Sequence, residues 1–423
     1  MKPQSANWKK ELLRILQGCR QAARELSQIS AAVKKKTLLE VARQLEKEKL
    51  AILRENRKDI KVAQGEGLSS VMIERLTLTE KRISEMAEGV EVVASLQDPI
   101  GRIQAQWTRP NGLKIVRVAV PLGVILIIYE SRPNVTVECA SLCFKSGNSV
   151  ILRGGKEAFY SNLALTSIFQ NIFRRSRLPV AGVSFVSTTD RKAVDFLLQR
   201  DQDIQLVIPR GGEALIRKVA RLSRIPVIKH YQGICHVYVD KEADLGKAVA
   251  ICYNAKMQRP SVCNAMETLL VNREIAAKFL PVLGEKLKAG GCEVRGDKST
   301  CALLPWATRA QAKDYGREFL DKILAVKMVP NLNAAMEHIQ QFGSAHTDAI
   351  VTEDADAARL FTAKVDSSSV MVNASTRFSD GFQYGFGAEI GISTDKIHAR
   401  GPMGLEGLTS YKYVVKGNGH IRT

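Results

Sequence analysis

Apolar residues recur at helical spacing through the first hundred residues of the chain. Segments 8–28 and 31–56 carry apolar positions on one face and charged positions on the other, which predicts two amphipathic helices. The sequence Leu-Thr-Leu-Thr-Glu at 76–80 is typical of a helix start, and Pro99 closes the region. The chain therefore opens with a helical region.

Beyond this region the pattern changes to short apolar runs. Residues 107–120 alternate around Asn111-Gly112, which predicts a β-hairpin. From residue 124, apolar runs alternate with helical segments, which predicts a mostly parallel sheet covered by helices on both faces. Nucleotides bind such sheets at the carboxyl ends of the strands. We expect strands at 124–129, 149–152, 183–186 and 205–208, and helices at 135–145, 161–174, 191–199 and 213–222.

A second strand–helix series begins near residue 236. Asn272 is the expected N-cap of a helix over 274–289, because its side chain can accept a hydrogen bond from the first turn. The tail at 410–415 is expected to form a late strand that no helix covers, a candidate oligomer edge. The other expected elements are strands at 236–239, 268–271, 323–328, 348–351 and 369–372 and a helix at 245–255.

The composition of the chain indicates which kinds of molecule the protein binds. The 423 residues are enough for two or three domains. Lys and Arg number 62 against 43 acidic residues, a net charge of +19 that favours anionic partners. This surplus is spread along the chain, and the run Lys34-Lys35-Lys36 has no interleaved aromatic residue, so we interpret it as a solvated face. We expect an anionic substrate and cofactor, and no nucleic-acid partner.

Neither a membrane span nor a metal site is predicted. The most apolar stretch, 118–129, is too short to cross a bilayer and contains Pro121, so we expect a cytoplasmic protein without a membrane partner. The eight cysteines form no CxxC pair, and the six histidines have no spacing typical of metal ligands. Reduced thiols and no metal are therefore expected.

Cys263 is the candidate nucleophile. It lies in the turn 258–265, between a helical run and an apolar strand, with Arg259 nearby. The thiolate is the reactive form of cysteine, and a neighbouring cation favours it. The alternative is a buried cysteine that acts as a small hydrophobic residue.

Several motifs resemble the aldehyde dehydrogenase superfamily when taken in order. They are residues 120–124, 146–156 and 208–212 and the turn that carries Cys263. Within the superfamily, the chain is similar to the γ-glutamyl phosphate reductase family over essentially its whole length. The segments that carry this similarity are 129–136, 258–264, 385–394 and 398–406.

The resemblance implies a reaction and a domain plan. The reaction is NADPH-dependent reduction of L-glutamyl 5-phosphate to L-glutamate 5-semialdehyde and phosphate, the second step of proline biosynthesis from glutamate, through a thioacyl group on Cys263. The fold implied is α/β and aldehyde dehydrogenase-like. It comprises a Rossmann-like NADP-binding domain at 1–103 and 118–231, an α/β catalytic domain at 232–397, and a small β oligomerisation element at 104–117 and 398–423. A homo-oligomer is expected, and a glutamate kinase partner is a pathway-level expectation.

The resemblance also implies catalytic roles. The backbone N–H of Cys263 and the side chain of Asn134 would stabilise the oxyanion, although Asn134 equally fits a helix N-cap. Ordinary aldehyde dehydrogenases carry a general-base glutamate in the stretch that corresponds to 230–236, which here has no acid. This absence favours a reductase over the alternative, a hydrolytic aldehyde dehydrogenase. His230 or His236 could donate a proton, or both could be structural.

Cofactor binding is assigned to five residues. Arg153 and Lys156 follow a strand and would favour the 2′-phosphate of NADP, since no acid lies nearby before Glu157; a merely solvated pair is the alternative. Gly211 and Gly212 would seat the pyrophosphate at a helix N-terminus. Glu318 resembles the acid that holds the nicotinamide ribose, or it is a surface glutamate on a helix.

Substrate binding is assigned to arginines. Arg132, Arg259 and Arg377 each lie in a family-like segment, and guanidinium groups suit bidentate contacts with phosphate or carboxylate. The sequence does not show which arginine would bind which anion.

Overall fold

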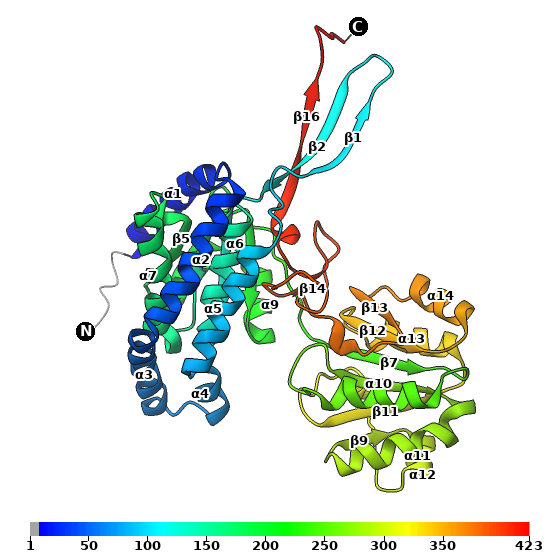
Figure 1. The fold of residues 1–423 in the computed structure, drawn as a ribbon. Helices are drawn as coiled ribbons and strands as arrows, with labels where there is room; N and C mark the ends of the chain where they lie inside the picture. The colour runs from blue at the N-terminus through cyan, green and yellow to red at the C-terminus, as the bar shows by residue number, and fades with distance from the viewer. Residues whose placement is uncertain (1–7, 423) are drawn as a thin grey trace. The chain divides into compact units, whose positions relative to one another are not determined.

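The computed structural model describes residues 8–422, which form two compact units (Figure 1). Unit 1 comprises the described residues up to Lys229, together with Gly385–Gly391 and the described residues from Met403 onward. Unit 2 comprises His230–Tyr384 and Ile392–Pro402. Within 8–422, no helix is both long and apolar enough to cross a membrane.

Unit 1 is built around a parallel sheet of four strands in the order β5-β4-β3-β6. Every residue of β3 is buried, which explains the continuous apolar run in its sequence. The chain passes from β3 to β4 and β5 on one side, and then to β6 on the other. The carboxyl ends of β3 and β6 therefore form a topological switch point, the usual place for a ligand in such a sheet. The bounds are β3 Val124–Tyr129, β4 Ser149–Arg153, β5 Val183–Phe185 and β6 Leu206–Arg210.

Helices cover both faces of this sheet. On one face, the apolar side of α1 packs with α8 and α9 against β3 and β4, with Leu12 and Leu16 almost fully buried. Helices α6 and α7 contact β4 and β5, and α5 and α2 pack on them in turn. The bounds are α1 Trp8–Leu26, α2 Ala31–Lys47, α3 Lys49–Gly65, α4 Ser70–Leu76, α5 Glu80–Ser95, α6 Asn134–Lys145, α7 Phe159–Arg175, α8 Arg191–Leu197 and α9 Glu213–Leu222.

Two predictions for the N-terminal region were wrong. The segment 31–56 is not one helix, because α2 ends at Lys47 and α3 begins at Lys49. Helix α2 packs on α5 whereas α3 packs on α7 and α4, so apolar periodicity continues through a change of direction. The solvated face predicted for Lys34-Lys35-Lys36 was wrong for Lys34 alone: its side chain is buried with Nζ 2.9 Å from a carboxylate oxygen of Asp98, whereas Lys35 and Lys36 are exposed.

The predicted hairpin and tail strand are confirmed. Strands β1 (Ile103–Thr108) and β2 (Lys114–Pro121) pair antiparallel. Strand β16 (Thr409–Lys416) pairs antiparallel with the other edge of β2, giving a three-stranded sheet (Figure 1, cyan and red). Most residues of β1 and β16 are exposed.

Unit 2 contains a sheet of seven parallel strands in the order β10-β9-β11-β8-β7-β12-β13. All residues of its central strands β7, β8 and β12 are buried. A separate ribbon of β14 (Ile392–Ser393) and β15 (Gly401–Pro402) completes the unit. The bounds are β7 Cys235–Val239, β8 Met266–Asn272, β9 Glu293–Gly296, β10 Thr308–Arg309, β11 Ile323–Val329, β12 Thr347–Val351 and β13 Ser369–Val372.

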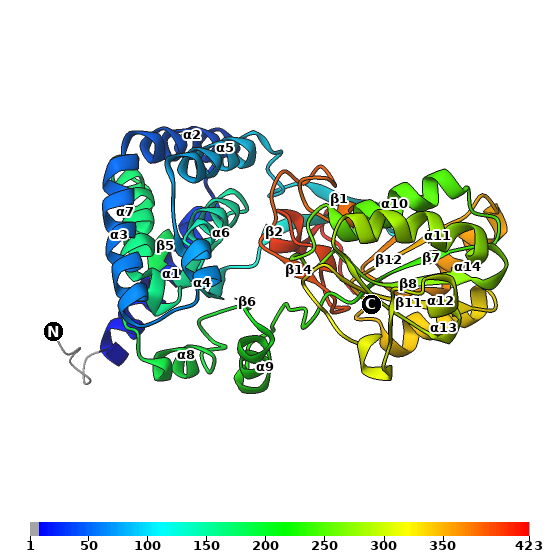
Figure 2. The ribbon, with the colours of Figure 1, turned by 90° about the horizontal axis from the view of Figure 1, so that it is seen from below.

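Helices also cover both faces of this second sheet. Helices α10 and α11 pack on one face, and α13 and α14 on the other (Figure 2). The predicted N-cap is confirmed, because the Asn272 side chain accepts the N–H of Glu274 at 3.0 Å. The bounds are α10 Leu245–Met257, α11 Arg273–Ala289, α12 Lys298–Leu303, α13 Leu332–Phe342 and α14 Ala355–Lys364.

Candidate active site

The candidate site lies at the amino-terminal edge of the unit 2 sheet. Strands β7, β8 and β12 are parallel neighbours, so the segments that enter them meet at one edge. These segments bring together His230, Cys263 and His346. One potential ligand atom from each of the three residues lies within 4.8 Å of the other two. His346 was not anticipated, because this proximity arises only from strand pairing.

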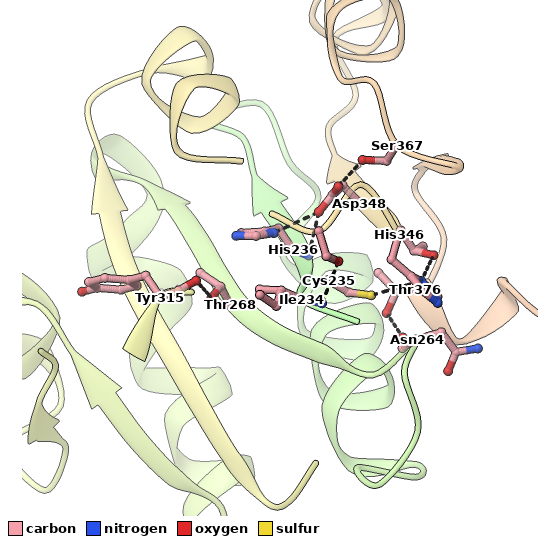
Figure 3. A network of polar contacts seen from close by, with 12 residues as sticks. Ile234, Cys235, His236, Asn264, Thr268, Tyr315, His346, Asp348, Ser367 and Thr376 are labelled. Carbon is pink, nitrogen blue, oxygen red and sulfur yellow. Dashed lines mark hydrogen bonds and ion pairs between the residues drawn. The ribbon is translucent and has the colours of Figure 1, made fainter. Parts of the chain in front are cut away.

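Cys263 is half-exposed, so its interpretation as a buried hydrophobic residue was wrong. The loop around it is held by buried contacts. The Cys235 Sγ donates to the Cys263 carbonyl at 3.2 Å. The Asn264 side chain donates to the Ser379 carbonyl at 2.9 Å. The Thr376 hydroxyl donates to the Asn264 carbonyl at 2.7 Å (Figure 3). Residue 263 is therefore partly exposed while its backbone is held in place.

Gly233 lies directly against this loop. A Cβ at position 233 would be 2.0 Å from the carbonyl oxygen of Cys263, far inside van der Waals contact. The two backbone segments can approach this closely only because residue 233 has no side chain.

The two histidines near Cys263 are held by different contacts. The Nδ1 of His230 donates to the carbonyl of Ile392 at 3.0 Å. His346 is fully buried, and burial, reinforced by His230, lowers its pKa to about 3, so it is neutral at physiological pH. Its Nδ1 lies 2.8 Å from the hydroxyl of Thr347.

His236 belongs to a separate buried network. Its backbone N–H and its Nδ1 lie 2.9 and 3.0 Å from the same carboxylate oxygen of Asp348, whose other oxygen accepts the Ser367 hydroxyl (Figure 3). The side chains of His236 and Asp348 are both fully buried. Of the two histidines considered as proton donors, only His230 is therefore grouped with Cys263. His236 instead belongs to a buried hydrogen-bond network with Asp348, as expected for a structural residue.

Two predicted substrate arginines lie close to the thiol. The Nε of Arg377 donates to the Gln258 side chain at 2.9 Å. Burial lowers the pKa of Arg377 and Arg259 lowers it further, whereas Asp380 and Cys263 raise it. Arg377 is therefore within electrostatic range of Arg259, Asp380 and Cys263, and its guanidinium favours the anionic form of the thiol.

A buried ion pair joins the two elements that flank the Cys263 loop. Lys256, in the last turn of α10, lies 2.6 Å from Glu267 in β8, and both side chains are fully buried. Burial raises the pKa of Glu267, and Lys256 opposes that rise. The same carboxylate accepts the N–H of Leu320 at 3.1 Å.

Glu318 is not a surface glutamate on a helix, so that alternative was wrong. It lies in an irregular segment, is half-buried, and accepts the N–H of Gly233 at 2.9 Å. The segment 230–236 has no acid of its own, but the tertiary structure brings this carboxylate to it.

The predicted cofactor residues of unit 1 lie at the carboxyl edge of its sheet. Arg153 ends β4 and is buried, and it donates to the carbonyls of Gly154 and Thr189. Lys156 is paired with Glu66 at 2.6 Å. The expectation that no acid lies near this pair of cations was therefore wrong, because the tertiary structure brings Glu66 to Lys156. Glu66 and Lys156 are far apart in the sequence, so no local pattern predicted this ion pair.

Gly211 and Gly212 lie at the switch point, immediately before α9. Gly212 is the N-cap of this helix, as expected for an anion-binding site. Its N–H donates at 2.8 Å to the carboxylate of Glu130, at the carboxyl end of β3. The helix N-terminus therefore already holds an anionic oxygen, which a pyrophosphate would have to displace.

Asn134 is the first residue of α6 and does not cap it, so the N-cap interpretation was wrong. Pro133 is the N-cap, and the Asn134 side chain donates to Glu138 at 2.8 Å. Burial raises the pKa of Glu138, while Asn134, Arg210 and the exposed Arg132 oppose the rise. Among the predicted site residues, Arg132 and Asn134 lie in unit 1. Unit 2 contains Cys263, Arg259, Arg377 and Glu318.

Comparison with known proteins shows which family the chain belongs to. The model of the aldehyde dehydrogenase family matches residues 4–322. The γ-glutamyl phosphate reductases of Moorella thermoacetica and Carboxydothermus hydrogenoformans are 52% and 53% identical to the chain, over 96% and 97% of its length. The matches cover 97% and 99% of those two proteins. The chain belongs to the γ-glutamyl phosphate reductase family, within the aldehyde dehydrogenase family.

A solved structure of the same family agrees with this membership. The crystal structure of γ-glutamyl phosphate reductase from Thermotoga maritima superposes with a TM-score of 0.95 at 44% identity, covering 98% of this chain and 100% of that one. The resemblance drawn from the motifs and the aldehyde dehydrogenase-like α/β fold are thereby confirmed. The family is one of oxidoreductases.

Proposed function

We propose that the chain reduces L-glutamyl 5-phosphate to L-glutamate 5-semialdehyde and inorganic phosphate with NADPH, in the cytoplasm, as a step of proline biosynthesis. The named relatives support the reaction over nearly the whole chain. The observation that carries the mechanism is the half-exposed Cys263 on a fixed loop within electrostatic range of Arg377, which also interacts with Arg259. A glutamate kinase is the proposed source of the acyl phosphate.

The first step is capture of the acyl group. The thiolate of Cys263 attacks the acyl carbon, and phosphate leaves with the electrons of the broken C–O bond, so a thioester forms without any redox change. Arg259 and Arg377 are the candidate contacts for the phosphate, because guanidinium groups form charge-assisted bonds with its oxygens. Arg132 is the third candidate, for either anionic group of the substrate.

The second step is reduction and release. When bound, NADPH supplies the hydride that reduces the thioester carbonyl. The Cys263 N–H and the Asn134 amide are the proposed donors to the resulting oxyanion. The oxyanion then reforms a carbonyl, the C–S bond breaks, and the thiolate returns. His230 is the proposed residue to hold a proton near the sulfur, because a ring nitrogen of His230 lies within 4.8 Å of it.

The residues of unit 1 fit a dinucleotide. The Gly212 N–H at the start of α9 donates to an anionic oxygen of Glu130, which supports Gly211 and Gly212 as the residues that would hold the pyrophosphate. Arg153 and Lys156 would hold the 2′-phosphate of NADP, which must then compete with Glu66 for Lys156. Glu318 is the proposed contact for the nicotinamide ribose.

The test is oxidation of L-glutamate 5-semialdehyde, the reverse reaction, with NADP and inorganic phosphate. Wild-type turnover should require phosphate. Cys263→Ala should abolish turnover and still bind NADPH, as measured by nucleotide fluorescence. The control is Cys301→Ser, which removes a half-exposed thiol elsewhere in unit 2. Appreciable turnover by the Cys263→Ala variant would overturn the assignment of the nucleophile.

One observation favours a second candidate, a hydrolytic aldehyde dehydrogenase. The Glu318 carboxylate lies beside Gly233, which contacts the Cys263 loop, and a carboxylate there could activate water. Reduction of NADP without phosphate, lost in Glu318→Gln, would support that reaction over the reductase.

A further inference from the structure

Three side chains that bind soft or borderline metals converge in unit 2. His230 lies just before β7, Cys263 in the loop before β8, and His346 immediately before β12. A ring nitrogen of each histidine and the Sγ of Cys263 lie within 4.8 Å of one another. Small side-chain movements would bring them to the separations of zinc ligands, which bind at about 2.0–2.3 Å from the ion.

The contacts of the two imidazoles suit metal coordination. His230 Nδ1 lies 3.0 Å from the carbonyl of Ile392, which can only accept, so Nδ1 carries a hydrogen and Nε2 is the ring nitrogen that can serve as a ligand. His346 Nδ1 lies 2.8 Å from the hydroxyl of Thr347, while its Nε2 is buried and has no hydrogen-bond partner. Histidine ligands of metals are normally held in this way, through the nitrogen that does not bind the ion.

We propose that His230, Cys263 and His346 form a site for Zn²⁺, and that Zn²⁺ bound there reversibly inhibits the enzyme. The ligand set is one sulfur and two nitrogens with a fourth position for water, which suits zinc and not an oxygen-seeking cation such as Mg²⁺. Coordination replaces the S–H bond with an S–Zn bond and releases the proton to solvent.

The inhibition follows from the identity of the ligand and rests on the proposed function, in which the same sulfur attacks the substrate. A thiolate bound to zinc no longer presents its electron pair to an acyl carbon. The neighbouring cations Arg259 and Arg377 repel a dication, so binding should be weaker than at a closed structural site and reversible by chelation.

Cobalt provides a readout that does not depend on activity. The full chain, free of added metal, is titrated with Co²⁺, and the thiolate-to-cobalt charge-transfer absorbance is recorded; Zn²⁺ is then added to displace the cobalt. The band should be absent in Cys263→Ser, and the dissociation constant should rise at least about tenfold in His346→Gln and in His230→Gln. Because His230 is half-exposed, its variant remains informative if His346→Gln fails to fold.

Matched controls remove a similar group elsewhere. Cys301→Ser and His420→Gln should leave the band and the dissociation constant unchanged, since Cys301 is half-exposed but outside the cluster and His420 is in the exposed tail. A band that persists in Cys263→Ser, or that disappears in Cys301→Ser, would overturn the site.

Turnover assays separate this proposal from the proposed function. Zn²⁺ should inhibit phosphate-dependent turnover of the wild type, EDTA should restore it, and the metal dependence should follow the cobalt titration. Metal binding through Cys263 without any turnover would refute the reductase and leave the site standing. Turnover without a cobalt band, or without inhibition at saturating Zn²⁺, would refute the site.

Discussion

At the scale of single residues, Gly233 lies directly against the backbone of Cys263, the proposed nucleophile. The position a Cβ would take at residue 233 is occupied by the carbonyl oxygen, carbonyl carbon and Cα of Cys263. These are backbone atoms, which cannot move aside as the end of a flexible side chain can. Any side chain at 233 must therefore displace the loop that carries the thiol.

We predict that Gly233→Ala lowers kcat by about 100-fold, because a displacement of about 1 Å of a reacting group has an effect of this size. The measurement is steady-state turnover with the fold checked by circular dichroism. The matched control is Gly316→Ala, also in unit 2, where the added Cβ would meet the Phe342 ring at an ordinary 3.6 Å. Equal kcat in the two variants would show that this contact does not position Cys263.

At the scale of elements, the junction between α10 and β8 is closed by the pair Lys256–Glu267. The helix end and the strand start that flank the Cys263 loop are joined by this fully buried contact of 2.6 Å. Such pairs are costly to break singly, because the remaining charge is left buried without compensation. The pair therefore stabilises the base of the loop.

We predict that Glu267→Leu lowers the free energy of unfolding by about 3–5 kcal/mol, as measured by urea denaturation. The double variant Lys256→Met/Glu267→Leu should recover much of this loss, because no charge is stranded. Recovery should fall short by about 1–3 kcal/mol, since the Leu320 N–H loses its acceptor. A double variant as unstable as the single one would contradict this account.

At the scale of the whole molecule, the three-stranded sheet of β1, β2 and β16 is the proposed oligomerisation element. It leaves aromatic side chains exposed, including Trp107 at 41% and Tyr413 at 54%, whose rings lie edge to face at 6.1 Å. Both β1 and β16 are edge strands that can pair with another chain.

We predict that the double variant Trp107→Lys/Tyr413→Lys has a lower mass in size-exclusion chromatography with light scattering than the wild type. Charged side chains would have to be desolvated in a contact that aromatic residues now favour. Leu50→Lys, on the 73% exposed Leu50 of α3, is the control for added charge. An unchanged mass in the double variant would remove this sheet from the assembly.

Acid stability is also a property of the whole chain. Burial is the main cause that lowers the pKa values of His338 and His346 to about 3. The unfolded chain binds these protons below about pH 6.5, whereas the folded chain does not until about pH 3. Stability contributed by the neutral histidines is therefore fully present above pH 6.5 and is lost as the pH falls towards 3.

We predict a slope of about 1.4 kcal/mol per pH unit for each histidine within this window. Urea denaturation between pH 7 and pH 4 should show a shallower pH dependence for His338→Gln than for the wild type. His420→Gln, which removes an exposed imidazole, should match the wild type. A His338→Gln curve parallel to the wild type would contradict the pKa assignment.

The elements that the sequence predicted well are those with a local signal. Strand β3 and helix α9 match their expected ranges. An apolar run or an amphipathic pattern indicates directly which residues of an element are buried. The hairpin was visible through Asn111-Gly112, and the N-cap of α11 through Asn272. Helices α13 and α14 were not anticipated individually.

For function, the sequence by itself determined the family and singled out Cys263 as the predicted nucleophile, because both signals reside in contiguous motifs such as 258–264. Only the tertiary structure decided what surrounds the thiol. His346, the carboxylate of Glu318 and the close approach of Gly233 come from segments far apart in the chain. The physical reason is that the pairing of parallel strands places the segments that enter them at one edge of the sheet. Strand order depends on long-range contacts that no local pattern encodes.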